Sequence, residues 1–245
     1  MARFCIKIAG TTAQVESLFE STRDYCRGYL TEQAADCFIA ATAEDLVLEQ
    51  ESLLEEALRE GFRPKQFPGP FLERSVLLKK LSEQLLAYST ILLHGSAVAV
   101  NGQGYLFSAK SGTGKSTHVR FWQQLLGQEA LIINDDKPFF RITPTEILVC
   151  GSPWNGKHGL DTNITVPLKG ICFLRRGSEN RIWKPDVQDA RTLLRANGCP
   201  PLDPVKQARY FSLLDTLAAR TALWSMECTK DPLAARIAYE AMSSQ

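Results

Sequence analysis

Residues 105–117, which read YLFSAKSGTGKST, decide the fold of this chain. The first four residues are typical of a short buried strand, and residues 109–116 match the Walker A pattern with Ala109 in place of the first glycine. A helix should follow and end at Gly127, because apolar residues recur at helical spacing from Val119 to Leu126. A strand, a glycine-rich loop and a helix N-terminus are the three parts that bind phosphate groups.

Each position of this loop has an expected role. Gly112 and Gly114 let backbone N–H groups approach phosphate oxygens without a Cβ in the way. Lys115 would neutralise phosphate charge and assist catalysis, and Ser116 would offer a hydroxyl group to Mg²⁺. We therefore expect ATP and Mg²⁺ as cofactors, with the nucleotide held by Ser111, Gly112, Thr113, Gly114, Lys115, Ser116 and Thr117. The alternative is a flexible Gly-Thr-Gly turn before an ordinary helix.

The segment before the loop predicts a β-hairpin. Apolar residues lie on both sides of Asn101-Gly102, a pair that tolerates the positive φ angles of tight hairpin turns. The strand that enters the phosphate loop should therefore have an antiparallel neighbour just upstream in the chain.

A pair of aspartates follows the next apolar strand, which we expect at residues 130–133. Asp135 lies twenty residues after Lys115, a spacing that fits a helix, a short turn and a strand. Asp135 and Asp136 should thus emerge at the carboxyl end of that strand, where α/β sheets bind ligands. One carboxylate would hold Mg²⁺ and the other would accept a proton from an attacking hydroxyl group, which favours a kinase over a hydrolase. The alternative is a turn with two solvated carboxylates.

The rest of the sequence predicts an α/β chain in two parts. Residues 1–88 form an α+β accessory region, with strands at 3–8 and 36–40 and helices at 43–60 and 71–88, and residues 89–245 form the P-loop kinase-like domain. The first helix should pack through Leu46, Leu53, Leu54, Ala57 and Leu58, with Glu49, Glu51, Glu55, Glu56 and Glu60 in solvent. The second part should continue with strands at 139–142, 147–150, 164–175 and 223–227, helices at 186–197 and 203–222, capped by Asp186 and Asp203, and a last helix after Pro232.

Composition excludes several classes of protein. The 245 residues are 44% hydrophobic and 22% charged, which is typical of a globular protein. A net charge of +1, from 28 basic and 27 acidic residues, gives no electrostatic footprint for nucleic acid or an anionic membrane. The seven cysteines are scattered singly, without the spacing of a zinc site or a disulfide framework. Without a signal-like or membrane-spanning stretch, we expect a cytoplasmic protein.

The sequence LLHGSAVAVNGQGYLFSAKSGTGKST, followed by IINDDKP, resembles the superfamily of HPr kinase/phosphorylase and ATP-dependent phosphoenolpyruvate carboxykinase. The resemblance covers residues 92–140 and implies their P-loop domain, in which an antiparallel hairpin precedes the P-loop strand of a mixed sheet. It also implies that His94, on the strand before the P-loop, assists the catalytic base Asp136, and that Asp135 and Ser116 bind the metal.

Further residues gain a role from the same resemblance. The loop at 151–159 lies where these kinases have a mobile loop that closes over the phosphates. Trp154 could then offer a stacking surface, Lys157 and His158 could reach a phosphate or substrate, and Arg175 or Arg176 could clamp a phosphate. The alternatives without a role in ligand binding are a tight turn at 151–159 and a solvent-facing arginine pair.

These observations predict a kinase that moves the γ-phosphoryl group of ATP to a hydroxyl group. The acceptor would be a small molecule such as free serine, or a serine of a peptide or protein. Two alternatives stay open: a nucleotide-binding regulatory protein without phosphotransfer, and a phosphoenolpyruvate carboxykinase-like lyase. The chain is less than half the usual length of such a lyase and lacks its substrate-binding arginine region. Residues 1–85 do not match the N-terminal domain of HPr kinase. The resemblance also implies a possible homo-oligomer.

Overall fold

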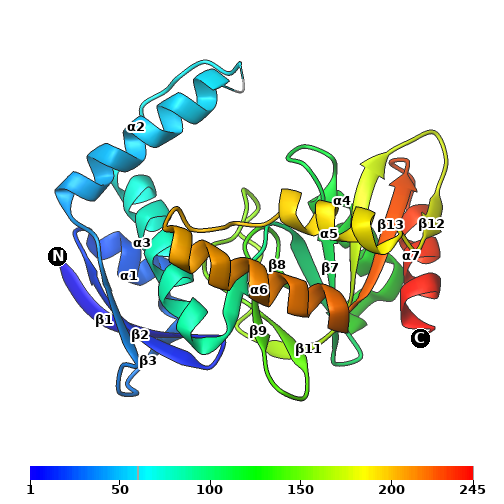
Figure 1. Cartoon of the computed structure of the whole chain (residues 1–245), viewed down its shortest axis with the longest axis horizontal. Coiled ribbons are helices and arrows are strands. Elements are labelled where there is room, and N and C mark those ends of the chain that lie inside the picture. The colour runs from blue at the N-terminus through cyan, green and yellow to red at the C-terminus, as the bar shows by residue number, and fades with distance from the viewer. Residues whose placement is uncertain (60, 245) are drawn as a thin grey trace. The chain divides into compact units, whose positions relative to one another are not determined.

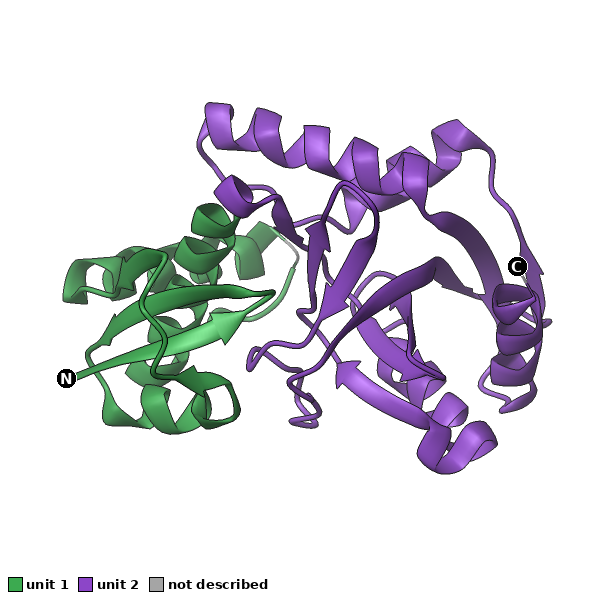
Figure 2. Ribbon diagram, turned by 90° about the horizontal axis from the view of Figure 1, so that it is seen from below, with its two compact units in different colours: residues 1–85 green, residues 86–245 purple. Residues whose placement is uncertain are grey.

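The structure is a computed structural model that describes residues 1–59 and 61–244. The chain divides into two compact units, residues 1–85 and residues 86–245, which Figures 1 and 2 show. Each unit has its own sheet and its own helices. Over the described residues, every helix is too short or too polar to cross a lipid bilayer.

The first unit is built on a four-stranded sheet. Its strands β1 (Ala2–Ile8), β2 (Thr11–Ser17), β3 (Leu30–Thr31) and β4 (Cys37–Ala40) lie in the order β3-β1-β2-β4. The strands predicted at 3–8 and 36–40 are confirmed as β1 and β4. The polar pattern of residues 9–35 predicted no element, yet Ala13 and Val15 of β2 are buried at alternate positions against the core of the unit.

Three helices and a 3₁₀ turn complete this unit: α1 (Glu20–Tyr25), η1 (Arg27–Tyr29), α2 (Ala43–Arg59) and α3 (Gly69–Leu85). Glu49 was expected in solvent on the acidic face of α2, and this expectation is wrong, because Glu49 is buried. Its carboxylate accepts hydrogen bonds from Ser75 at 2.6 Å and from Lys79 at 2.5 Å, both on α3, and this pairing offsets the cost of burying the charge. Leu58, expected on the packed face, is exposed, and Glu60 lies outside the described residues.

The second unit is α/β, with a nine-stranded mixed sheet. Its main path runs β5-β9-β10-β11-β7-β6-β8, and β13 pairs with β11 and with β12. The strands are β5 (Thr90–Leu92), β6 (Ser96–Val100), β7 (Gln103–Ser108), β8 (Ala130–Asn134), β9 (Phe139–Ile142), β10 (Ile147–Cys150), β11 (Thr165–Arg176), β12 (Arg181–Trp183) and β13 (Ala222–Cys228). The sequence predicted all of these except β12, with β5 and β6 expected as one continuous strand.

Helices cover both faces of this sheet (Figure 1). They are α4 (Lys115–Leu126), α5 (Val187–Ala196), α6 (Pro204–Arg220) and α7 (Leu233–Ser243), with 3₁₀ turns η2 (Leu86–Tyr88) and η3 (Gly127–Glu129). Side chains of β7 alternate between the two cores: Leu106 packs with α5 and α6, and Phe107 packs with α4 and α7. The predicted caps are confirmed, because Asp186 and Asp203 each accept a hydrogen bond from a backbone N–H in the first turn of α5 and α6.

The predicted hairpin is confirmed. Strand β6 runs antiparallel to β7, and Asn101 and Gly102 have φ angles of 50° and 73° in the two-residue turn between them. The apolar run before the turn is divided, however. Residues 90–92 form β5, which pairs with β9, and the chain leaves the sheet at residues 93–95 before β6 begins. His94 therefore lies in a break between two strands, and its predicted place on the strand is wrong.

Candidate active site

The glycine-rich loop joins β7 to α4 at the carboxyl end of a central strand. Gly112 and Gly114 have φ angles of 75° and 122°, which residues with a side chain rarely adopt. Gly114 is the N-cap of α4, so the loop delivers its backbone N–H groups to the positive end of a helix of 12 residues. The local structure thus provides the geometry of an anion-binding loop.

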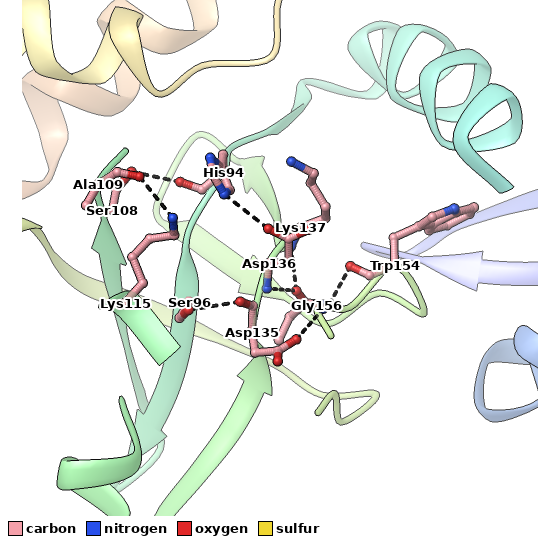
Figure 3. A network of polar contacts seen from close by, with 11 residues as sticks. His94, Ser96, Ser108, Ala109, Lys115, Asp135, Asp136, Lys137, Trp154 and Gly156 are labelled. Carbon is pink, nitrogen blue, oxygen red and sulfur yellow. Dashed lines mark hydrogen bonds and ion pairs between the residues drawn. The ribbon is translucent and has the colours of Figure 1, made fainter. Parts of the chain in front are cut away.

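Lys115 is the first residue of α4 and is buried. Its ammonium group donates a hydrogen bond of 2.9 Å to the carbonyl oxygen of Ala109, so the side chain lies over its own loop (Figure 3). Burial lowers the pKa of Lys115, and nearby Asp136 partly opposes that change. Lys115 therefore places a poorly solvated positive charge at the concave side of the loop.

The two aspartates leave the end of β8 in different directions. Asp136 Oδ1 lies 3.1 Å from His94 Nε2, whereas Asp135 Oδ1 accepts a hydrogen bond from the backbone N–H of Gly156 (Figure 3). Burial alone would raise the pKa of Asp136, but the contact with His94 and the charge of Lys137 hold it below its ordinary value. Burial raises the pKa of Asp135, and Asp136 adds to that rise. The two carboxyl groups are therefore driven apart in pKa, as expected for groups with different tasks.

His94 is fixed by its main chain although it lies outside the strands. Its N–H donates to Asn197 O at 3.1 Å, and its carbonyl oxygen accepts a hydrogen bond of 2.7 Å from Ser108 Oγ at the end of β7. The next residue, Gly95, donates to Asp136 O at 3.0 Å. These bonds tie the histidine to the phosphate loop on one side and to the aspartate on the other.

These groups line one cavity of about 440 Å³. Among the predicted residues it contains His94, Ser111, Gly112, Gly114, Lys115, Ser116, Thr117, Asp135, Asp136, Lys157 and His158. Thr113 lines two neighbouring cavities instead. One cavity thus joins the glycine-rich loop, its lysine, the aspartate pair and the histidine.

The loop at 151–159 is only partly available to a ligand. Lys157 and His158 are exposed at its tip and line the cavity. Trp154 is 6% exposed and does not line this cavity, and its carbonyl oxygen accepts a hydrogen bond of 3.2 Å from Asn134 Nδ2. A stacking surface requires an open ring face, so the expectation for Trp154 finds no support.

The two arginines at the end of β11 have different surroundings. The guanidinium group of Arg176 donates a hydrogen bond of 2.5 Å to Gly112 O in the phosphate loop. Arg175 is paired with Glu227 at 3.0 Å, and its guanidinium lies over the ring of Trp183. Of the two, Arg176 is the residue that contacts the loop.

Asp135 offers a test of whether a divalent cation fits. The residue is 4% exposed, and its Oδ2 accepts no hydrogen bond from any described residue, which is costly for a buried oxygen unless a cation or donor satisfies it. The described part of the chain holds no cluster of three or more His, Cys, Asp and Glu residues that would bind a metal unaided. Asp135 thus has one buried oxygen free of hydrogen bonds from the described residues, and Mg²⁺ commonly binds one or two carboxylates together with substrate phosphates.

Sequence reasoning missed the residues that hold this site in place. Asn134 is fully buried and bonds both to the aspartate pair and to the 151–159 loop, and Ser96 Oγ donates to Asp135 O at 2.9 Å. The signal for Asn134 was present, because a polar amide at the end of the apolar run A-L-I-I stands directly before two aspartates. Ser96 and Ser108 carry no such signal within their strands.

Three comparisons with known proteins bear on this chain. A family model described as SynChlorMet cassette protein ScmC matches residues 72–199, a range that includes the loop and the aspartate pair. The search of curated proteins finds no match. Among solved structures, the Hpr(Ser) kinase/phosphatase from Coxiella burnetii is similar over 38% of this chain and 77% of its own, with 12% identity and a TM-score of 0.29. A structural similarity this weak carries no argument about fold or function.

Proposed function

We propose that this chain, which belongs to the family of SynChlorMet cassette protein ScmC, is a kinase that uses ATP and Mg²⁺ to phosphorylate a hydroxyl group. The observation that carries the proposal is the shared cavity, where Lys115 of the phosphate loop lies with Asp135 and the His94–Asp136 pair. Phosphate binding, metal binding and activation of a hydroxyl group all need such groups side by side.

The phosphates of ATP would bind at the N-terminus of α4. The backbone N–H groups of residues 111–116 would donate to phosphate oxygens, and Lys115 would exchange its hydrogen bond to Ala109 O for one to a phosphate. Because the group is already buried, its charge would act at low local dielectric and stabilise negative charge that develops during transfer.

Ser116 and Asp135 would hold the metal. The Oδ2 atom of Asp135, buried without a donor, supports this role for the carboxylate. When bound, Mg²⁺ would neutralise charge on the β- and γ-phosphates. The chain's own part is to orient Asp135, and the N–H of Gly156 both orients the carboxylate and partly offsets the rise in its pKa on burial.

Asp136 and His94 would act on the acceptor. Asp136 is held ionised, so it can orient an acceptor hydroxyl group and accept its proton late in the transfer. Its lowered pKa makes it a weak base, which suits the loose transition state of phosphoryl transfer, where positioning matters more than proton abstraction. His94 would hold the carboxylate in place through its 3.1 Å contact.

The remaining parts of the two substrates have room nearby. A cavity of about 410 Å³ on the α4 side of the loop, lined by Thr117, Phe121, Thr229 and Lys230 among others, would take the nucleoside. The acceptor would be a small hydroxyl compound or a serine of a peptide or protein. We also propose that the second unit has the P-loop type of fold found in the HPr kinase and phosphoenolpyruvate carboxykinase superfamily, and the order of hairpin, loop and paired aspartates supports this proposal.

Transfer of label from γ-labelled ATP tests the proposal, with free serine and a library of serine-containing peptides as acceptors. The wild-type chain should label an acceptor in the presence of Mg²⁺. Asp136→Asn should reduce transfer by at least about a hundredfold, the range lost with a general base, while ATP affinity stays within about threefold. Asp215→Asn, a matched change at an exposed residue that pairs with Arg195, should leave both unchanged.

Two outcomes would decide against this function. If the chain binds ATP and labels no acceptor, a regulatory nucleotide-binding protein explains the loop better. If Asp136→Asn weakens ATP binding and transfer equally, the role given to Asp136 is wrong.

A further inference from the structure

Asn134 is the last residue of β8 and is fully buried, and each polar atom of its side chain is used. Its Oδ1 accepts hydrogen bonds from the backbone N–H groups of Asp136 at 2.8 Å and Lys137 at 2.6 Å. An Asn side chain that bonds to the next residues in this way fixes the direction in which the chain leaves the strand. Asn134 thus sets the main-chain path that carries Asp136.

The other end of the same amide holds the loop at 151–159. Asn134 Nδ2 donates to Ser152 O at 2.8 Å, with Ser152 Oγ and Trp154 O each at 3.2 Å. Ser152 Oγ in turn donates to Lys137 O at 2.7 Å, which closes the network. The oxygen side of one amide therefore orients the aspartates, and its nitrogen side orients the loop.

A second link joins the same two segments a few residues further along. The N–H of Gly156 donates to Asp135 Oδ1, and a Cβ atom at position 156 would lie 3.2 Å from both carboxylate oxygens. Figure 3 shows Gly156 beside Asp135. With residues 152–156 held in this way, Lys157 and His158 project from a fixed base toward the cavity.

We propose that Asn134 is a positioning residue that joins the aspartate pair and residues 152–156 into one rigid unit, which presents Asp135 to the metal and Asp136 to the acceptor. The role given to this unit, in binding metal and acceptor, rests on the proposed function. The coupling itself rests on the hydrogen bonds of Asn134. The loop expected to be mobile is accordingly anchored at its base.

The test uses the Gly156 amide, which has no hydrogen bond to Asn134 itself. Asn134→Asp keeps an acceptor for the amides of Asp136 and Lys137 but places an oxygen against the carbonyl groups of Ser152 and Trp154. Amide hydrogen exchange should then become at least about tenfold faster at Gly156 and stay within about threefold at Asp136. Asn134→Ala should accelerate exchange at the amides of Asp136, Lys137 and Gly156.

Nucleotide binding supplies the second readout. ATP affinity measured with EDTA should stay within about threefold of wild type in Asn134→Asp, whereas the gain in affinity on adding Mg²⁺ should fall by at least about tenfold. Thr162→Val is the matched control. It removes a 2.8 Å hydrogen bond from the segment after the loop to Ile132 O in the same strand, away from the aspartates, and should change neither readout.

The outcomes separate the two proposals. Unchanged Gly156 exchange in Asn134→Asp, or the same acceleration in Thr162→Val, would overturn the role of Asn134. If Asn134→Asp and Asn134→Ala do not fold, Ser152→Ala removes the two contacts of the Ser152 hydroxyl in the same network, with Asn134 Nδ2 and Lys137 O, and should accelerate Gly156 exchange by at least about threefold. If the wild-type chain neither binds Mg²⁺ with ATP nor labels an acceptor, the proposed function fails, and Gly156 exchange still decides on Asn134.

Discussion

The imidazole Nε2 of His94 lies 3.1 Å from the carboxylate Oδ1 of Asp136, although the two residues leave different strands of the sheet. Two hydrogen bonds hold the backbone near this contact: Gly95 N–H donates to Asp136 O, and the side-chain Oγ of Ser108 donates to His94 O. The contact favours the ionised form of Asp136 and opposes the effect of burial.

The first prediction concerns the acid limb of phosphotransfer. In the proposed reaction Asp136 acts in its ionised form, so activity should be lost as pH falls through its pKa, which His94 holds below the ordinary value. His94→Gln should raise that pKa, and the acid limb should move to higher pH. A pH profile of kcat at saturating Mg²⁺, which would keep Asp135 ionised, measures the shift, with Asp215→Asn outside the cavity as the control. If the acid limb of His94→Gln stays at the pH of the wild type, the effect of His94 on Asp136 is contradicted.

A second prediction separates two lysines that both act on Asp136. Lys115 lines the cavity with the phosphate loop, and Lys137 does not line it. Lys115→Met should weaken ATP binding by about tenfold or more, because a charge-assisted hydrogen bond to phosphate contributes about 1.5–3 kcal/mol. Lys137→Met should stay within about twofold of wild type. Equal losses in a titration with a fluorescent ATP analogue would mean that general charge, and not the loop lysine, holds the phosphates.

The sequence predicted the parts of this site that depend on local pattern. The loop, the hairpin at Asn101-Gly102 and the position of the aspartates after β8 each follow from short motifs with defined backbone needs. Both helix caps followed for the same reason. Their physical causes lie within a few residues of the chain, so the pattern is sufficient.

The sequence pattern did not predict features that depend on contacts between residues far apart in the chain. Glu49 is buried because Ser75 and Lys79 of another helix meet it, and nothing near Glu49 in sequence indicates these partners. The break at His94 arises because the residues before it pair with β9 and those after it pair with β7. Asn134 is explained by the loop eighteen residues later that accepts its N–H groups.

A third prediction distinguishes the neighbouring arginines of β11. Arg176 already contacts Gly112 O, so its guanidinium lies where phosphate groups would bind, whereas Arg175 is occupied by Glu227 and Trp183. Arg176→Ala should weaken ATP binding by about tenfold, within the range for a charge-assisted hydrogen bond, and Arg175→Ala by less than about twofold. Isothermal titration of the two variants measures this. The reverse order would show that Arg175 leaves its partners when the nucleotide binds.

The last prediction concerns stability in acid. His118 in the first turn of α4 is 3% exposed, its ring centroid lies 4.5 Å from that of Phe107, and Nε2 has no hydrogen-bond partner among the described residues. Burial lowers the pKa of His118 from 6.5 to about 4. Between these values the unfolded chain binds the proton and the folded chain does not, so stability present above pH 6.5 is lost as pH falls toward 4.

The shift corresponds to about 3 kcal/mol in total, of which about 2 kcal/mol should be lost between about pH 7 and about pH 5. His118→Leu removes the titrating group and keeps a side chain of similar volume. Between these two pH values the free energy of unfolding of the variant should therefore fall by about 2 kcal/mol less than the free energy of unfolding of the wild type. Urea unfolding of both proteins at the two pH values measures the difference. The loss of ring packing in the variant lowers its stability equally at both pH values, so it does not affect this comparison. Equal pH dependence would mean that His118 is protonated in the folded chain, and that the first turn of α4 opens to admit water.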